Sequence, residues 1–560
     1  MFDLIVKNGT VVDGLGNARY RADVGVRDGV ITAIGDLNAE SAHKLIDATN
    51  RIVAPGFIDP HTHFDVQLLW DGEARPALEH GITTVVPGNC SLSLAPLKVE
   101  HRDSLIGMFQ QIEELPNAAF TQAFEWTWES FAGYRDALAK NLSINVAPLV
   151  GHSVIRLWAM GDAAQQRAAT ADEIMAMQGV LRTCLEAGAI GLSTSFVDVD
   201  AKALPVPSRW AHQDELDALA AVLGEFGRML QVVPEFYNTD LTIARVDQLA
   251  ELSLKHNIPT TFSPLFDSAL NADNITRTMK RVDEQFARGA RVWPQVQTRP
   301  IDISFSFEDP SLFFGRLPKW YRTLRLPRDE RINALRDPAT ADKLVADAGA
   351  DGGMAIFGRL RVRAGESAPA HLEGRLLVDI AQARGESLAR ALINVSLEHD
   401  LKVPFLAENM GHDAAERVGP LLAHPHVHVG ASDGGAHIRS FSTYGDTGYL
   451  FSKFVRGTNH LSLEGAVQKI TSDTADIWGL KNRGAIKTGF AADLVVFDSD
   501  TIDRGRERAV HDMPGGGLRY VRDSIGIDTV VVNGTVAYEN GTYKESKSGV
   551  VCAAAISRSR

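Results

Sequence analysis

The 560-residue chain has little cysteine and no excess of positive charge. Its three cysteines, Cys90, Cys184 and Cys552, form no C-x-x-C pair. This spacing argues against a disulfide framework and fits a reducing cytoplasm, where we expect the protein to be. The formal net charge of −13 argues against a nucleic-acid partner, because phosphate binding needs a positive face.

Long apolar runs are also missing. We find no segment of about 20 apolar residues that could span a bilayer, and the first seven residues carry Asp3 where a signal peptide would be apolar. We therefore expect no membrane partner. Hydrophobic residues make up 45% and charged residues 23% of the chain, which is typical of a globular protein with a large core. The sequence leaves open whether the protein assembles into a homo-oligomer.

Short β-branched runs alternate with longer helical patterns from about residue 53 to residue 476. This alternation predicts an α/β fold with parallel strands, and eight such units would close into a (β/α)₈ barrel of the TIM type. The strand candidates after the first are residues 82–86, 144–150, 189–193, 229–233, 258–262, 292–296 and 427–431. The run 403–408 is one strand more than a barrel needs.

One helix between these strands has a clear start and end. Thr170-Ala171-Asp172-Glu173 has the pattern of a capping box, and Gly188 is typical of a helix end. The apolar residues that share one face of this helix are Ile174, Met177, Leu181, Cys184 and Leu185.

Both ends of the chain break the alternation. Residues 4–46 and the tail segments 493–497 and 529–532 read as short strands joined by Asn-Gly and Asp-Gly turns. We predict that residues 1–54 and 481–560 pair into one small β-sandwich domain beside a barrel of residues 55–480. An insertion at about 301–373 interrupts the barrel and is predicted to act as a lid.

His61 and His63 end the run of residues 52–60, and residues two apart on a strand face the same side. Neutral imidazoles are good ligands for zinc and similar ions. The segment from His424 to His428 has the same spacing but begins a strand, whereas barrel sites lie where strands end. We therefore expect the metal at the first pair.

Asp433 ends the last strand candidate and should emerge at the same rim as the two histidines. A carboxylate there can bind a metal and accept a proton from water. The following Gly434-Gly435 also permits a simple Asp-Gly turn.

Several strings together resemble the amidohydrolase superfamily, within it the D-aminoacylase (N-acyl-D-amino-acid deacylase) branch. They are Val53-Ala54-Pro55-Gly56-Phe57-Ile58-Asp59 before His61, Gly88-Asn89-Cys90, Gly188-Ala189-Ile190-Gly191-Leu192-Ser193-Thr194, Ser432-Asp433-Gly434, and Gly484-Ala485-Ile486-Lys487 with Ala492-Asp493-Leu494-Val495. The resemblance covers nearly the whole chain and implies a metal-dependent amidohydrolase with one or two divalent ions, zinc being the expected metal.

The resemblance implies that Cys90 is a metal ligand, although a buried structural cysteine is the alternative. It also implies histidine ligands after strands five and six, where this chain has Glu235 and Ser263 instead. We predict Glu235 as a replacement ligand, with an arginine partner or a substrate-facing acid as alternatives. Metal analysis should then find one ion held by His61, His63 and Asp433, with Cys90 or Glu235 completing the set.

Other polar residues are placed at the predicted rim. His152 and His437 are candidates to polarise a substrate carbonyl or to orient a metal ligand, although either could be an ordinary loop histidine. Arg439, Arg299 and Ser263 are predicted to contact the substrate, the arginines through a carboxylate. No arginine stands near residues 442–444, where the branch places one, and this counts against a typical N-acyl-D-amino acid.

The resulting prediction is metal-dependent hydrolysis of an amide bond in a small molecule, such as an N-acyl amino acid, with Asp433 moving the proton. One alternative is hydrolysis of a cyclic amide, urea or carbamate on the same fold. Another is a barrel that has lost ligands and binds small molecules without catalysis. A nucleic-acid deaminase would need a P-C-x-x-C signature that is missing.

Overall fold

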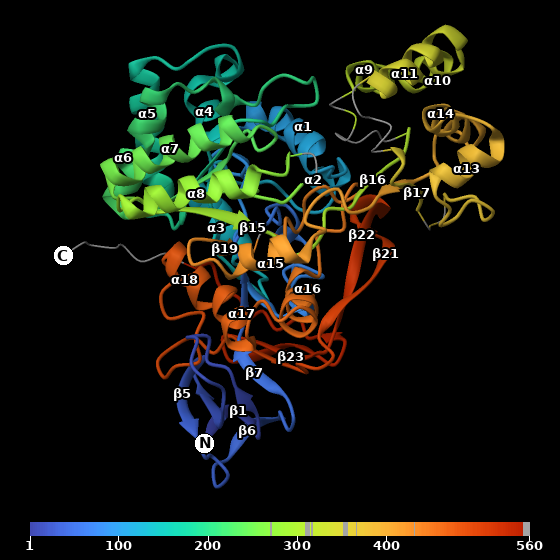
Figure 1. Ribbon diagram of the computed structural model, residues 1–560. Helices are drawn as coiled ribbons and strands as arrows, with labels where there is room; N and C mark the ends of the chain where they lie inside the picture. Colours follow the sequence, from blue (N-terminus) through green and yellow to red (C-terminus); the bar gives the residue numbers. More distant parts are fainter. Residues whose placement is uncertain are drawn as a thin grey trace. The chain divides into compact units, whose positions relative to one another are not determined.

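The computed structural model describes residues 1–268, 271–308, 314, 317–350, 357–363, 365, 367–430 and 432–552 (Figure 1). The chain divides into two compact units. The first comprises Met1–Arg299, Ala414–His437 and Thr443–Arg560, and the second comprises Pro300–Asp413 and Ile438–Ser442. No helix among the described residues combines the length and the apolar character needed to cross a membrane.

Parallel strands form the centre of the first unit. They are β8 (Phe57–Asp59), β9 (Ile82–Val85), β10 (Asn145–Val146), β11 (Val150–Gly151), β12 (Gly191–Ser195), β13 (Met229–Val233), β14 (Thr260–Phe262), β15 (Val292–Val296) and β19 (His428–Val429). One sheet has the order β10-β9-β8 and another β11-β12-β13-β14-β15-β19, with every pair parallel. The strands β10 and β11 occupy one predicted run, which Pro148 interrupts.

A parallel bridge also joins Thr62, after β8, to Gly434, after β19. Hydrogen bonds reinforce it, since the Asp433 amide donates to the His61 carbonyl at 3.1 Å and the His63 amide to the Gly434 carbonyl at 2.7 Å. The first and last parallel strands therefore end side by side. The predicted α/β class is confirmed.

Helices lie between these strands and after the last of them. Those between the strands include α1 (Arg102–Ile112), α3 (Phe131–Leu138), α4 (His152–Met160), α5 (Ala171–Glu186), α6 (Gln213–Phe226), α7 (Thr239–His256), α8 (Asn274–Ala287) and α15 (Ala415–Ala423), and α17 (Leu463–Lys469) and α18 (Ser472–Trp478) follow β19. Successive helices from α4 to α8 contact one another, and Figure 1 shows them as one green group. The capping box predicted at the start of α5 is confirmed.

The two ends of the chain meet in a seven-stranded sheet of order β25-β24-β23-β20-β7-β2-β3. Its strands are β2 (Thr10–Val11), β3 (Tyr20–Arg21), β7 (Ile52–Pro55), β20 (Leu494–Phe497), β23 (Ile527–Val532), β24 (Thr535–Glu539) and β25 (Thr542–Tyr543). A second sheet, β5-β4-β1-β6, contains β1 (Phe2–Lys7), β4 (Asp23–Arg27), β5 (Val30–Gly35) and β6 (Ala42–Asp47).

Both sheets contribute to one hydrophobic core, in which Leu4 and Val26 pack with Val53, Val496 and Val531. In Figure 1 the blue strand β7 reaches the red strands of the C-terminal tail, where β20 lies between β7 and β23 and is hydrogen-bonded to both. The tail also contains a long hairpin that the sequence patterns did not predict, β21 (Asp503–Met513) with β22 (Gly517–Ile525).

The second unit has its own core around Trp320, Phe357 and Phe405. It contains an antiparallel sheet of β16 (Ile303–Phe305), β18 (Phe405–Ala407) and β17 (Leu360–Val362), and the helices α9 (Pro318–Leu324), α10 (Arg328–Arg336), α11 (Pro338–Ala350), α13 (Leu377–Arg384) and α14 (Leu388–Glu398). The surplus run 403–408 is therefore a strand of this unit. The unit continues to Asp413, about forty residues beyond the predicted insertion, and its role as a lid stays a prediction.

Candidate metal centre

The two histidines after β8 are buried and held in fixed orientations. His61 and His63 are each 3% exposed. The Nδ1 of His61 lies 2.8 Å from Oε1 of Gln295 on β15, and the Nδ1 of His63 lies 2.9 Å from Oε1 of Glu113, directly after α1. The Gln295 oxygen is an acceptor, so the His61 ring donates through Nδ1 and presents an unprotonated Nε2. Burial lowers the pKa of His63, but Glu113 and Cys90 outweigh it and raise that pKa well above its usual value, so His63 has to lose a proton before it can bind a metal.

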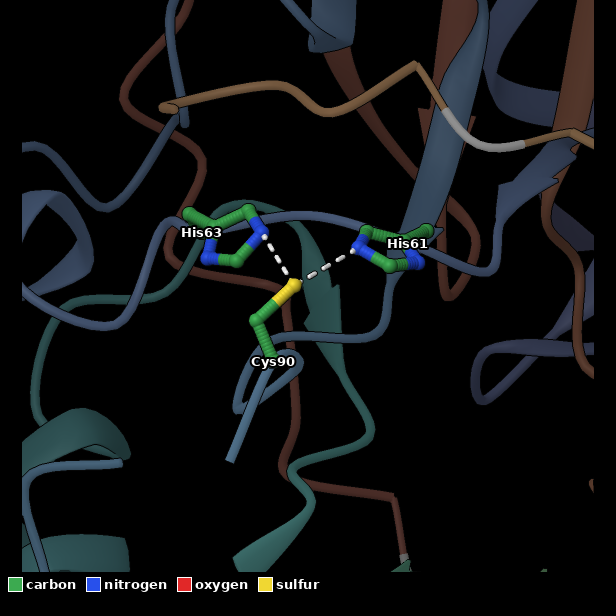
Figure 2. A group of neighbouring side chains, drawn as sticks. All are labelled: His61, His63 and Cys90. Carbon is green, nitrogen blue, oxygen red and sulfur yellow. Dashed lines mark hydrogen bonds between the residues drawn. The ribbon is translucent and has the colours of Figure 1, made fainter. Parts of the chain in front are cut away.

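Cys90 completes a group of three ligand atoms. Its Sγ lies 3.5 Å from Nε2 of His61 and 3.6 Å from Nε2 of His63, and Figure 2 shows both rings directed at the sulfur. The residue has a φ of 54°, a left-handed conformation that is unusual without glycine and that turns the side chain at this point of the loop.

Asp433 reaches the same group from the last parallel strand. Its Oδ1 lies 3.2 Å from Nε2 of His63 and 3.7 Å from Nε2 of His61. Its Oδ2 lies 3.6 Å from Nε2 of His437. The hydrogen bond from the Asp433 amide to the His61 carbonyl fixes the backbone at this position.

The distances from the two imidazoles to Cys90 and to Asp433 are close to those around a tetrahedral zinc ion. The group whose ligand atoms all lie within 4.8 Å of one another is His61, His63 and Cys90, and Asp433 is not part of it. With Zn–N near 2.05 Å and Zn–S near 2.3 Å, a nitrogen and a sulfur ligand lie about 3.5 Å apart, and a nitrogen and an oxygen about 3.3 Å apart. The observed N–S distances are 3.5 and 3.6 Å and the N–O distances 3.2 and 3.7 Å. Imidazole, thiolate and carboxylate are also the ligands that zinc prefers.

The electrostatics of the group agree with cation binding. Burial lowers the pKa of His61 to about 4 and keeps its Nε2 unprotonated. Burial raises the pKa of the Cys90 thiol to about 12, so a thiolate at this position needs a cation beside it. Burial opposes ionisation of Asp433, but the hydrogen bond from His63 and the nearby histidines outweigh it and lower the pKa of the carboxyl.

Two predicted residues have other partners. His152 is fully buried, and both of its ring nitrogens are engaged, Nδ1 with Thr194 at 2.9 Å and Nε2 with Glu215 at 2.8 Å. It has no nitrogen left to polarise a carbonyl, so the predicted catalytic role is wrong. Glu235 pairs with Arg245 at 2.8 Å and does not join the ligand group, which corrects its prediction as a metal ligand.

The predicted substrate contacts have mixed outcomes. Arg299 is buried, pairs with Asp446 at 2.8 Å and donates to the Ser432 carbonyl, so it has a structural partner instead of a substrate carboxylate. His437 lies beside Asp433, with its Nε2 3.6 Å from Oδ2, and its substrate contact stays a prediction. Ser263 is buried after β14, and Arg439 belongs to the second unit. Their substrate contacts stay predictions.

Three polar residues near the group were missed from the sequence. Gln295 is a polar residue in the predicted strand 292–296, which is otherwise apolar, and this is a signal that the sequence offered; the structure buries it completely. Glu113 follows a helix at no recognisable spacing. Asp198, beyond β12, has a buried Oδ2 without a hydrogen-bond partner among the described residues. Burial raises its pKa to about 6, and Glu113, His437 and His63 are close enough to influence it.

Comparison with known proteins gives full-length relatives. N-acyl-D-glutamate deacylase of Alcaligenes xylosoxydans xylosoxydans is 31% identical, over 96% of this chain and 93% of its own. D-aminoacylase of the same organism is 28% identical, over 99% of this chain and 98% of its own.

Solved structures agree. The N-acyl-D-glutamate deacylase of Bordetella bronchiseptica, crystallised with zinc and a phosphonate inhibitor, matches 99% of this chain and 100% of its own, with a TM-score of 0.69 and 29% identity. A D-aminoacylase structure matches 99% of this chain and 100% of its own, with a TM-score of 0.68 and 28% identity. The resemblance to the D-aminoacylase branch is therefore confirmed. The profile Amidohydro_3, described as the amidohydrolase family, matches residues 44–257 and 328–538, and the chain belongs to this family.

Proposed function

We propose that the protein is a metal-dependent hydrolase that removes the acyl group from N-acyl-D-amino acids. The observation that carries the proposal is the convergence of His61, His63 and Cys90, with Asp433 in contact with both imidazoles. Full-length relatives named as deacylases of N-acyl-D-glutamate and N-acyl-D-aspartate support the substrate class.

The scaffold that we propose for this site is a closed (β/α)₈ barrel with a β-sandwich formed by both chain ends. Parallel pairing from β8 to β19 and the bridge between Thr62 and Gly434 support closure. The common core of the two terminal sheets supports the sandwich. The metal centre then lies where the barrel strands end, which is where this fold places its active sites.

The four side chains would hold one divalent ion, with zinc the best match to a set that contains a thiolate. The chemistry that such an ion would supply is a lowered pKa of water, which would make a nucleophile available at neutral pH. The replacement of the expected histidines after β13 and β14 by other residues favours a centre of one ion.

Asp433 is the proposed acid and base. Its Oδ2 is turned away from His61 and His63, toward His437, and is placed to take a proton from the attacking water. The same carboxyl then gives the proton to the leaving nitrogen, which an amide needs because an amide anion is a poor leaving group. With His152 excluded, His437 is the histidine proposed to donate a hydrogen bond to the substrate carbonyl.

A substrate panel tests the proposal. Purified protein with its metal should release free amine from N-acetyl-D-amino acids, with the L-enantiomers and cyclic amides such as hydantoins as comparisons. A chelator should abolish the activity, and added zinc should restore it. Exclusive turnover of cyclic amides would replace the proposed substrate class, and no hydrolysis of any amide by zinc-loaded protein would contradict the enzyme itself.

Asp433→Asn tests the mechanism. Asparagine keeps the size of the side chain but cannot accept the proton, and general acid–base catalysis contributes about 10²–10⁴-fold. We expect kcat to fall at least about 1,000-fold while circular dichroism stays unchanged. A kcat within tenfold of the wild type would exclude Asp433 as the acid and base.

A further inference from the structure

A second group of metal-ligating side chains lies near the start of β19. It is separate from the first group, which Asp433 approaches from the other end of the same strand. The second group consists of Asp283 on α8 and of His424 and His426, which come directly after α15. One ligand atom from each of the three lies within 4.8 Å of the others, and among the described residues only His61, His63 and Cys90 form another such group.

The geometry of this second group is close to that of a metal site. The Nδ1 of His426 lies 2.7 Å from Oδ1 of Asp283, and the Nε2 of His424 lies 3.4 Å from Oδ2. A nitrogen and an oxygen bound to the same tetrahedral zinc lie about 3.3 Å apart. Only small side-chain movements therefore separate these donors from a coordination shell, with water as the fourth ligand.

The donors are also oriented and accessible. The ring of His426 stacks on Phe286 with centroids 3.9 Å apart and planes within 1° of parallel, which restricts its rotation. The side chains of Asp283, His424 and His426 are between 29% and 45% exposed. An ion can reach them from solvent without any change in the fold.

Two features make this group a weaker site than the first. The Nδ1 of His424 accepts a hydrogen bond from the His426 amide at 3.2 Å, so neutral His424 carries its proton on Nε2. Metal binding at Nε2 moves that proton to Nδ1 and breaks the hydrogen bond. Lys469, whose Nζ donates to the His424 carbonyl at 2.7 Å, also places a positive charge nearby.

We propose that Asp283, His424 and His426 form a second, weaker site for a divalent transition metal such as zinc, independent of the metal centre at His61. A preparation that contains two zinc equivalents would then hold one ion at each of two separate sites and would not be evidence of a two-metal active centre. The ligand set of two imidazoles and a carboxylate favours zinc over calcium or magnesium, which prefer oxygen ligands.

Isothermal titration of zinc into the purified holoenzyme tests this site. We expect one additional equivalent, bound at least tenfold more weakly than the first. Asp283→Asn and His426→Gln should each abolish the additional equivalent and leave hydrolytic activity unchanged. His43→Gln, which alters an exposed histidine elsewhere, is the matched control and should bind as the wild type does.

Thermal unfolding shows whether Asp283→Asn and His426→Gln are folded. One folded variant of the two is enough to test the second site. Loss of the weak equivalent in a folded variant with normal activity supports the second site. Persistence of the weak equivalent in the folded variants, or wild-type protein that takes up no additional zinc, overturns it. Activity is a separate measurement, so failure here would leave the proposed hydrolysis intact.

Discussion

At the scale of single residues, the two metal-binding histidines differ in what holds them. His61 donates to the amide oxygen of Gln295, whereas the Nδ1 of His63 lies 2.9 Å from the buried carboxylate of Glu113. A carboxylate behind a ligating histidine fixes its tautomer and makes its other nitrogen a stronger donor to the metal. Glu113 is therefore a positioning residue that acts through His63.

Glu113→Gln tests this role, because glutamine keeps the shape of the side chain and removes its charge. We expect metal affinity to fall about 10–100-fold, measured by competition with a chelating dye, together with a changed visible spectrum of the cobalt-substituted protein. Glu125→Gln, at an exposed position, should leave both unchanged. If Glu113→Gln bound the metal with the affinity of the wild type, the contact between Glu113 and His63 would contribute packing alone and not position the ligand.

The metal ligands could be predicted from the sequence because they follow strand ends, but their partners could not. The positions of His61, His63 and Asp433 at strand ends placed all three at one rim. Cys90 was predicted as a ligand only through the resemblance to the family. Glu113 comes from a distant loop that only tertiary packing brings to His63. His152 and Arg299 were placed correctly along the chain, but burial gave each a protein partner that no local pattern reveals.

At the scale of elements, the start of α5 shows how much a local pattern can specify. The Thr170 hydroxyl accepts from the Glu173 amide, and the Glu173 carboxylate accepts from the Thr170 amide. All four residues of the motif are contiguous, so no distant contact was needed to predict it. The boundary between β10 and β11 was missed because it depends on how Pro148 is accommodated between neighbouring strands.

Thr170→Ala should lower the free energy of unfolding by about 1 kcal/mol, since it removes one half of the capping box. Thr183→Ala, at an exposed position within the same helix, should be neutral or slightly stabilising because alanine favours helix interiors. Thermal denaturation compares the two. An equal effect of both substitutions would mean that the cap contributes nothing measurable.

The Glu173 half of the same motif should depend on pH. Its hydrogen bond with Arg167, followed by that with Thr170, lowers the pKa of Glu173 from 4.5 to about 2. A carboxyl whose pKa is lowered by folding stabilises the protein fully above its unfolded value and loses that contribution as the pH falls from about 4.5 toward 2. The Tm difference between wild type and Glu173→Gln should therefore be constant from pH 7 to pH 5.5 and smaller at pH 4. A difference that grows on acidification would contradict this sign.

At the scale of the whole molecule, residues more than 400 positions apart form one core. The strand β20 pairs with β7 on one side and β23 on the other, and Val496 is buried with Leu4 and Val53. The short strands and turns at the two chain ends predicted that they would pair with each other, because neither end alone has enough strands to bury a hydrophobic core. The extent of the second unit was harder to predict, since its segment 374–413 has the same helix and strand patterns as the first unit.

Val496→Ala tests whether the strands from the two chain ends unfold as one cooperative unit. Removing two buried methyl groups should destabilise the first unit by about 2 kcal/mol. Because β1, β7 and β20 share one core, amide hydrogen exchange should accelerate in all three strands and not only around the substitution.

Val362→Ala is the matched control, since Val362 is an equally buried valine on a strand of the second unit. Its effect on exchange should be concentrated in β16, β17 and β18. If Val496→Ala accelerated exchange in β20 and β23 while β1 and β7 kept their protection, the N-terminal strands would be stable without the C-terminal ones. The parallel strand β8 follows β7 after a single residue, Gly56. Loosening of β7 should therefore also lower the metal affinity at His61 and His63, whereas Val362→Ala should not.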